Sequence, residues 1–133
     1  MKTKTFIRRR GAGLFKNEKG ILLVAHRNRI FHLPGGGAHY NESRKSAMER
    51  ELMEELNIKI KKSKFILEHL GKEYHYSSRY SNKFAKDKTK LFEIEIEGKI
   101  KIQNEIKYQI FWTPESNEIL SSDTQQILQH LRK

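Results

Sequence analysis

The sequence contains no cysteine, and only two of its 133 residues are proline. Without cysteine the chain can form neither a disulfide framework nor a thiolate metal site, a composition that suits the cytoplasm. The two prolines mark no interdomain linker, and the chain has the length of one ordinary domain. We therefore expect a single cytoplasmic domain over residues 1–133.

Long hydrophobic runs are missing as well. The longest apolar stretch is ILLVA at residues 21–25, far shorter than the roughly 20 residues that a membrane-spanning helix needs. The basic N-terminus MKTKTFIRRR is not followed by an apolar segment, so the sequence predicts no signal peptide. These features indicate that the protein does not associate with a membrane.

Acidic residues are outnumbered, with 16 Asp and Glu against 27 Lys and Arg, which gives a net charge of +11. This balance favours anionic partners such as nucleotides, RNA or acidic surfaces. A Lys-rich surface that reflects only general composition is an equally good interpretation. The lysines are scattered, and no stretch alternates basic and aromatic residues densely enough to predict an RNA-binding strip.

Hydrophobic periodicity predicts a mixed α/β domain. A turn is expected at 16–20, and residues 64–76 are expected to form one bent strand or two. Helices are expected at 43–56 and 121–133, because capping residues precede both segments. Strands are expected at 5–15, 21–27, 29–33, 90–98 and 106–112.

The helix at 43–56 carries an unusual group of carboxylates. Glu51, Glu54 and Glu55 fall within an arc of about 100° next to the apolar stripe of this helix. They also lie in its last turns, where the helix dipole disfavours anions. A divalent cation such as Mg²⁺ would cancel their repulsion, since it prefers oxygen ligands. The alternative is a solvated face, on which Arg50 pairs with Glu54 and Lys59 pairs with Glu55.

Three glycines, Gly35, Gly36 and Gly37, stand between the strand expected at 29–33 and this helix. We expect them to form a loop, because glycine allows the backbone to approach a ligand closely and to turn a carbonyl or N–H towards it. A tight turn would explain the glycines equally well. A glycine turn that leads into a carboxylate-rich helix nevertheless favours a ligand site.

Together these residues resemble the signature of the Nudix hydrolase family, in its small MutT-like form. The signature runs Gly, five residues, Glu, seven residues, Arg-Glu, aliphatic, any, Glu-Glu, any, Gly, aliphatic. The chain departs from it only at Asn57, which stands where the family has Gly. Asn tolerates the left-handed conformation that ends a helix, so the departure is read as structural. The matching residues are Gly36, Glu42, Arg50, Glu51, Leu52, Glu54, Glu55 and Ile58.

The resemblance implies a Nudix fold, an α/β/α sandwich around a mixed sheet. It also implies hydrolysis of a nucleoside diphosphate linked to another moiety. Glu51, Glu54 and Glu55, aided by the Gly35 carbonyl, would hold Mg²⁺ or Mn²⁺. One of these glutamates or Glu105 would act as general base, and the alternative for Glu105 is an ordinary surface residue. Arg50 would orient a glutamate through a salt bridge, with Glu42 as its partner.

Substrate identity depends on residues outside the signature. Gly36 and Gly37 are expected to approach the substrate. Tyr76 follows the signature at the distance where some dinucleoside polyphosphate hydrolases have a Tyr, and Arg79 lies nearby to meet phosphates. The alternative for this tract is a sheet-edge strand and loop with half-buried tyrosines.

Two classes of function remain open. The first is a pyrophosphohydrolase acting on a nucleoside triphosphate, a dinucleoside polyphosphate or an RNA 5′ end. The second is a Nudix-fold module that binds a nucleotide or RNA 5′ end as a sensor. Retention of all the signature glutamates favours the enzyme.

Overall fold

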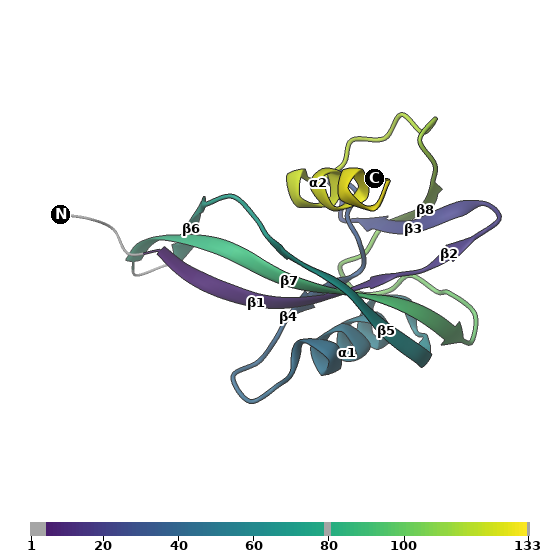
Figure 1. The fold of residues 1–133 in the computed structure, drawn as a ribbon, viewed down its shortest axis with the longest axis horizontal. Coiled ribbons are helices and arrows are strands. Elements are labelled where there is room, and N and C mark those ends of the chain that lie inside the picture. Colours follow the sequence, from purple (N-terminus) through teal and green to yellow (C-terminus); the bar gives the residue numbers. More distant parts are fainter. Residues whose placement is uncertain (1–4, 79–80, 133) are drawn as a thin grey trace.

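Two β-sheets lie between two helices in the computed structural model, which describes residues 5–78 and 81–132. The helix α1 (Arg44–Leu56) covers one side and α2 (Ser122–Leu131) covers the other (Figure 1). The smaller sheet contains β2 (Lys16–Asn17), β3 (Gly20–Ala25) and β8 (Tyr108–Trp112). The larger sheet contains β1 (Thr5–Leu14), β4 (Gly35–Gly37), β5 (Lys59–Leu70), β6 (Tyr74–Ser78) and β7 (Ser81–Glu97).

The larger sheet is mixed and has the order β4-β1-β7-β5, with β6 paired to β7. Its central pair, β1 and β7, is parallel over ten residue pairs from Thr5 opposite Phe84 to Leu14 opposite Glu93. The other pairs in this sheet are antiparallel. The predicted α/β class with a mixed sheet between helices is therefore confirmed.

The apolar core has two parts, one on each side of the larger sheet. Met48, Leu52 and Leu56 of α1 are fully buried in the first part, as the helical stripe predicted. Leu91 of β7 and Ile127 of α2 belong to the second. Neither helix in the described part of the chain has the length and apolar composition needed to cross a membrane.

Two predicted elements are wrong. Residues 29–33 form no strand, because Phe31 and His32 make only isolated bridges to Leu120 and Val24. The strand is instead formed by Gly35–Gly37, which we had expected to be a loop. These glycines pair with Arg10–Ala12 of β1, so tertiary pairing overrides the low strand propensity of glycine.

The remaining expectations differ from the structure mainly in their boundaries. Segment 64–76 belongs to two strands, β5 and β6, and the strand expected at 90–98 begins nine residues earlier, at Ser81. The predicted turn at 16–20 includes the two-residue strand β2. Both helices lie where capping residues predicted them.

Candidate active site

A cleft of about 740 Å³ opens between the larger sheet and the beginning of α2. One end is lined by Gly35, Gly36 and Gly37 of β4 and by carboxylates of α1. Further parts of the lining come from one face of β1, from β6 and β7, from the segment between β3 and β4, and from the start of α2. The site therefore draws on segments that are far apart in the sequence.

The helix α1 is held at both ends, which fixes the position of its carboxylates. At its start, the side chain of Ser43 accepts a hydrogen bond from the Ser46 amide at 3.0 Å. At its end, Asn57 adopts the left-handed conformation with φ 57°, and its amide donates to the Met53 carbonyl. The helix thus ends at Asn57 in the left-handed conformation that asparagine tolerates.

Three carboxylates converge at the α1 end of the cleft. Glu51, Glu55 and Glu105 each place one oxygen within 4.8 Å of the others. Glu55 is only 3% exposed, and its Oε1 has no hydrogen-bond partner among the described residues. Burial, together with the charges of Glu51 and Glu105, raises the pKa of Glu55 to about 8, an effect that the Gly35 backbone partly opposes.

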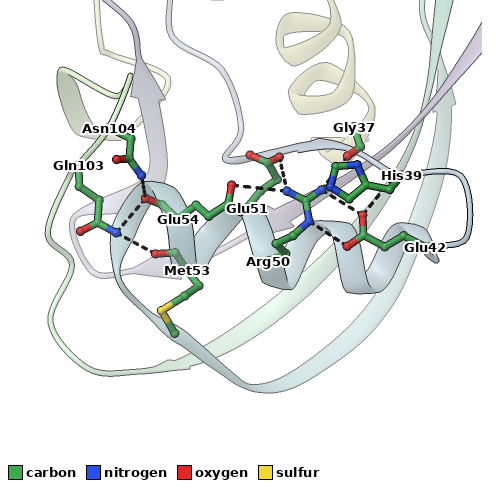
Figure 2. Close-up of polar contacts among 9 residues, drawn as sticks. All are labelled: Gly37, His39, Glu42, Arg50, Glu51, Met53, Glu54, Gln103 and Asn104. Atoms are coloured by element: carbon green, nitrogen blue, oxygen red, sulfur yellow. Dashed lines mark hydrogen bonds and ion pairs between the residues drawn. The ribbon is translucent and has the colours of Figure 1, made fainter.

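The loop that carries Glu105 is attached to the end of α1. The side-chain amide of Gln103 donates to the carbonyls of Met53 and Glu54, at 3.0 and 2.8 Å. The Asn104 side chain donates to the Glu54 carbonyl at 2.7 Å (Figure 2). These bonds satisfy carbonyls that the helix end leaves free and place Glu105 beside the helix carboxylates. Sequence reasoning missed Gln103 and Asn104, because no local pattern links them to α1.

Glu54 lies apart from this group. Its side chain is 52% exposed, and its carboxylate is 3.5 Å from Nη1 of Arg50. The structure thus brings Glu105 to the other two carboxylates and directs Glu54 towards Arg50. Arg50 and Glu54 thus form the ion pair that was expected for a solvated helix face.

Arg50 connects the signature residues. Its Nε and Nη2 donate to the two carboxylate oxygens of Glu42 at 2.9 and 3.0 Å, and its Nη1 donates to Glu51 at 2.9 Å (Figure 2). Its Nη2 also donates to the Gly37 carbonyl at 3.0 Å. Hydrogen bonds from Arg50 and from the His39 backbone lower the pKa of Glu42 to about 2. The expected ion pair of Arg50 with Glu42 is present, and it holds Glu51 in place.

Packing around β4 requires glycine at positions 35 and 36. A Cβ on Gly36 would lie 2.5 Å from Cδ of Glu51, and one on Gly35 would lie 2.1 Å from the Gly11 carbonyl oxygen. The fold itself therefore needs Gly35 and Gly36, a reason that neither ligand approach nor a tight turn had suggested. Because Gly36 pairs with Gly11, the carbonyls of Gly35 and Gly37 point away from β1. On that side the Gly37 carbonyl accepts the hydrogen bond from Arg50.

The two substrate residues expected after the signature are placed differently. Tyr76 lies on β6, where its ring packs edge-on against Phe6 with centroids 5.2 Å apart and stands under the Arg8 guanidinium. It is 39% exposed and lies outside the cleft, which Tyr74 of the same strand lines instead. Arg79 lies outside the described residues.

The residues of the cleft fit a hard divalent cation. The three converging donors are all carboxylate oxygens, which Mg²⁺ and Mn²⁺ accept as ligands. The unpartnered oxygen of Glu55 is buried among them, and such an oxygen is costly unless a ligand meets it. Glu51 and Glu55 are therefore suitable ligands, and Glu105 is close enough to join them.

Comparison with known proteins gives a consistent result. The family model described as NUDIX domain matches residues 7–129. A member of the nudix hydrolase family from Chromobacterium violaceum has a TM-score of 0.75 and 24% identity, with 95% of this chain and 77% of that chain covered. The ORF135 protein of E. coli has a TM-score of 0.70 and 19% identity, with 96% and 92% covered.

A MutT NUDIX hydrolase from Burkholderia pseudomallei is similar as well. It has a TM-score of 0.67 and 16% identity, with 92% of this chain and 96% of that chain covered. These structures are similar to the present chain in fold. A search of curated protein sequences finds no significant match.

Proposed function

Because the chain belongs to the NUDIX family of hydrolases, which act on phosphoric anhydride bonds, we propose that it is a metal-dependent pyrophosphohydrolase. Its substrate would be a nucleoside diphosphate linked to another moiety, such as a nucleoside triphosphate or a dinucleoside polyphosphate. The convergence of Glu51, Glu55 and Glu105 around an unpartnered buried oxygen supports the proposal most strongly.

The proposed roles follow from the positions of the side chains. Glu51 and Glu55 would hold Mg²⁺ or Mn²⁺ with the Gly35 carbonyl, and Glu54 would join them only if its side chain turned away from Arg50. The cation would supply charge neutralisation and a more acidic water. Arg50 and Glu42 keep the Glu51 carboxylate oriented. Glu105 is exposed at the cleft, so its carboxylate can accept the proton of an attacking water.

The substrate would lie along the cleft beyond these carboxylates. Gly36 and Gly37 line its wall, so the diphosphate can approach the backbone there. Tyr76 does not line the cleft, so it would meet only the distal part of a long substrate. Arg79 stays a proposed phosphate contact on the grounds of the sequence. An RNA 5′ end carries the same phosphate chemistry and is included among the candidate substrates.

A panel of nucleotide substrates tests the proposed function. Nucleoside triphosphates, dinucleoside polyphosphates, ADP-ribose and 5′-triphosphate RNA would be incubated with Mg²⁺ or Mn²⁺. Release of phosphate, pyrophosphate and nucleoside monophosphate would then be measured. We expect turnover of at least one compound and its loss on removal of the cation.

Two matched variants assign the activity to the site. Glu55→Gln keeps the size of the side chain but removes a charge, and turnover should fall by about two orders of magnitude or more. Lys45→Gln lies on the exposed side of the same helix and should retain the wild-type rate. Circular dichroism verifies that both variants fold. Normal turnover by folded Glu55→Gln would exclude the assigned site and favour a nucleotide-binding or RNA 5′-end sensor.

A further inference from the structure

Four polar side chains outside the Nudix signature form a connected group on the floor of the cleft. Arg8 and Arg10 come from β1, Asp87 comes from β7, and Tyr74 comes from β6. The Tyr74 hydroxyl donates to Oδ1 of Asp87 at 2.7 Å and accepts from Nη1 of Arg8 at 2.9 Å. Nη1 of Arg10 donates to Oδ2 of Asp87 at 3.1 Å.

The parallel pairing of β1 with β7 creates this group. Arg8 stands directly opposite Asp87 in the register, so both side chains project from the same face of the sheet. Arg10 follows two residues later on that face, roughly 7 Å along the strand. Two guanidinium groups thus face one carboxylate, and the group carries a net positive charge.

The hydrogen-bonding capacity of Asp87 is used within this group, whereas that of the two arginines is only partly used. The Asp87 side chain is only 9% exposed, and both of its oxygens are engaged by Tyr74 and the arginines. Asp87 therefore has little capacity to accept hydrogen bonds from the edge of a nucleobase. The Arg10 and Arg8 side chains are 29% and 33% exposed, so guanidinium N–H groups remain available to the cleft.

Arg10 lines the cleft between Arg8 and the glycine strand β4. It stands opposite Gly37 in the β1–β4 ladder, next to the strand that packs on Glu51. Its charge is close enough to the carboxylate site to oppose the upward pKa shift of Glu55, and it also contributes to the lowered pKa of His32. A ligand that reaches from the glutamates along β1 meets Arg10 first and Arg8 next.

We propose that Arg10, positioned by Asp87 and Tyr74, binds phosphate oxygens beyond the diphosphate at the glutamate site. Arg8 extends this contact. The enzyme would accordingly select substrates with three or more consecutive phosphates over substrates with two. Arginine suits this task because its planar donors match phosphate oxygens, and Asp87 holds the plane in one orientation. This inference rests on the proposed function for its substrate but concerns residues that the Nudix signature does not contain.

A binding experiment tests the inference without catalysis. The melting temperature would be measured in metal-free buffer with millimolar inorganic tripolyphosphate or with pyrophosphate. We expect tripolyphosphate to stabilise the wild type more than pyrophosphate does, and Arg10→Met to lose this difference. Lys86→Met removes one positive charge from the opposite face of the sheet, next to Asp87 in sequence, and should behave as the wild type.

A kinetic experiment tests the selectivity. For the best polyphosphate substrate, Arg10→Met should lower kcat/KM by about 10- to 100-fold, mainly through KM. For ADP-ribose, which has two phosphates, the change should be small. Arg10→Lys keeps the charge without the planar donors and should recover only part of the loss. Asp87→Asn should raise KM for the polyphosphate and leave kcat unchanged, as expected of a positioning residue.

A chain of three phosphates can come from a free nucleotide or from an RNA 5′ end. Comparing a nucleoside triphosphate with a 5′-triphosphate RNA oligonucleotide as substrates identifies the source. The inference would be overturned if Arg10→Met lost kcat/KM equally on the polyphosphate and on ADP-ribose. It would also be overturned if tripolyphosphate raised the melting temperature of Arg10→Met as much as that of Lys86→Met. Wild-type protein that hydrolyses nothing yet binds tripolyphosphate through Arg10 would overturn the proposed function alone.

Discussion

At the scale of single residues, the protonation of Glu55 couples the site to the stability of the protein. In metal-free protein, burial and two neighbouring carboxylates raise the pKa of Glu55 from 4.5 to about 8. The folded state therefore binds this proton more tightly than the unfolded state. The free energy of unfolding consequently falls as the pH rises from about 4.5 to about 8.

Glu55→Gln removes this dependence, because Gln stays neutral at every pH. We expect the variant to gain stability relative to the wild type as the pH increases from about 5 to about 9. Urea unfolding in the presence of a chelator measures the difference at each pH. A difference that stays constant over this range would show that the folded Glu55 titrates like an unfolded carboxyl.

The residue scale also shows what a helical pattern can predict. The spacing on α1 predicted the ion pair of Arg50 with Glu54, because helix geometry fixes neighbours within one turn. The ion pair of Arg50 with Glu42 and the conformation of Asn57 were expected from the family signature instead. The spacing did not separate Glu54 from Glu55, since both side chains lie on one arc. Their difference comes from the partners brought by the rest of the fold, which bury Glu55 and leave Glu54 exposed.

At the scale of elements, two adjacent glycines of β4 should differ in the effect of an alanine substitution on stability. A methyl group on Gly36 would collide with the Glu51 carboxylate, whereas one on Gly37 would meet only the end of the Arg8 side chain at 3.4 Å. Gly36→Ala should therefore lower the free energy of unfolding by about 2 kcal/mol, and Gly37→Ala should change it little. Chemical denaturation compares the two variants, and equal stabilities would contradict the packing of β4 on α1.

The end of α1 gives a second test at this scale. Asn57 has φ 57°, a conformation that Gly adopts without strain and a β-branched residue does not. Asn57→Gly should be neutral or mildly stabilising, whereas Asn57→Val should destabilise the protein by about 1 kcal/mol or more. Thermal unfolding of the pair checks this expectation. A neutral Val variant would mean that the helix ends in another conformation.

Element boundaries were predictable only where local signals act. The capping residue Ser43 and the apolar stripe located α1, since both signals come from neighbouring residues. The strand β4 could not be recognised, because three glycines carry no strand signal and their pairing depends on Arg10–Ala12, more than twenty residues earlier.

At the scale of the whole molecule, metal binding should appear as added stability. A cation that binds only the folded carboxylate site raises the melting temperature by mass action. We expect millimolar Mg²⁺ or Mn²⁺ to do so in the wild type but not in a Glu51→Gln, Glu55→Gln double variant. Scanning calorimetry with and without cation measures the shift, and an equal shift in both proteins would place the cation elsewhere.

The composition of the cleft could be predicted only in part. The signature identified the glutamates of α1, and the family resemblance suggested Glu105 as a further carboxylate that acts as general base. Arg10, Asp87 and Tyr74 were not identified as one group, because strands far apart in the sequence bring them together. Hydrophobic periodicity locates strands but does not determine which strands pair.

The parallel pairing of β1 with β7 also sets the order of events in folding. Thr5 pairs with Phe84 and Leu14 pairs with Glu93. During synthesis, β1 can therefore form this pairing only after residues about eighty positions later have left the ribosome. Such non-local contacts are typical of domains that fold on the order of milliseconds to seconds. Since the same pairing aligns Arg8 with Asp87, the nascent chain acquires the complete lining of the cleft only when this late contact forms.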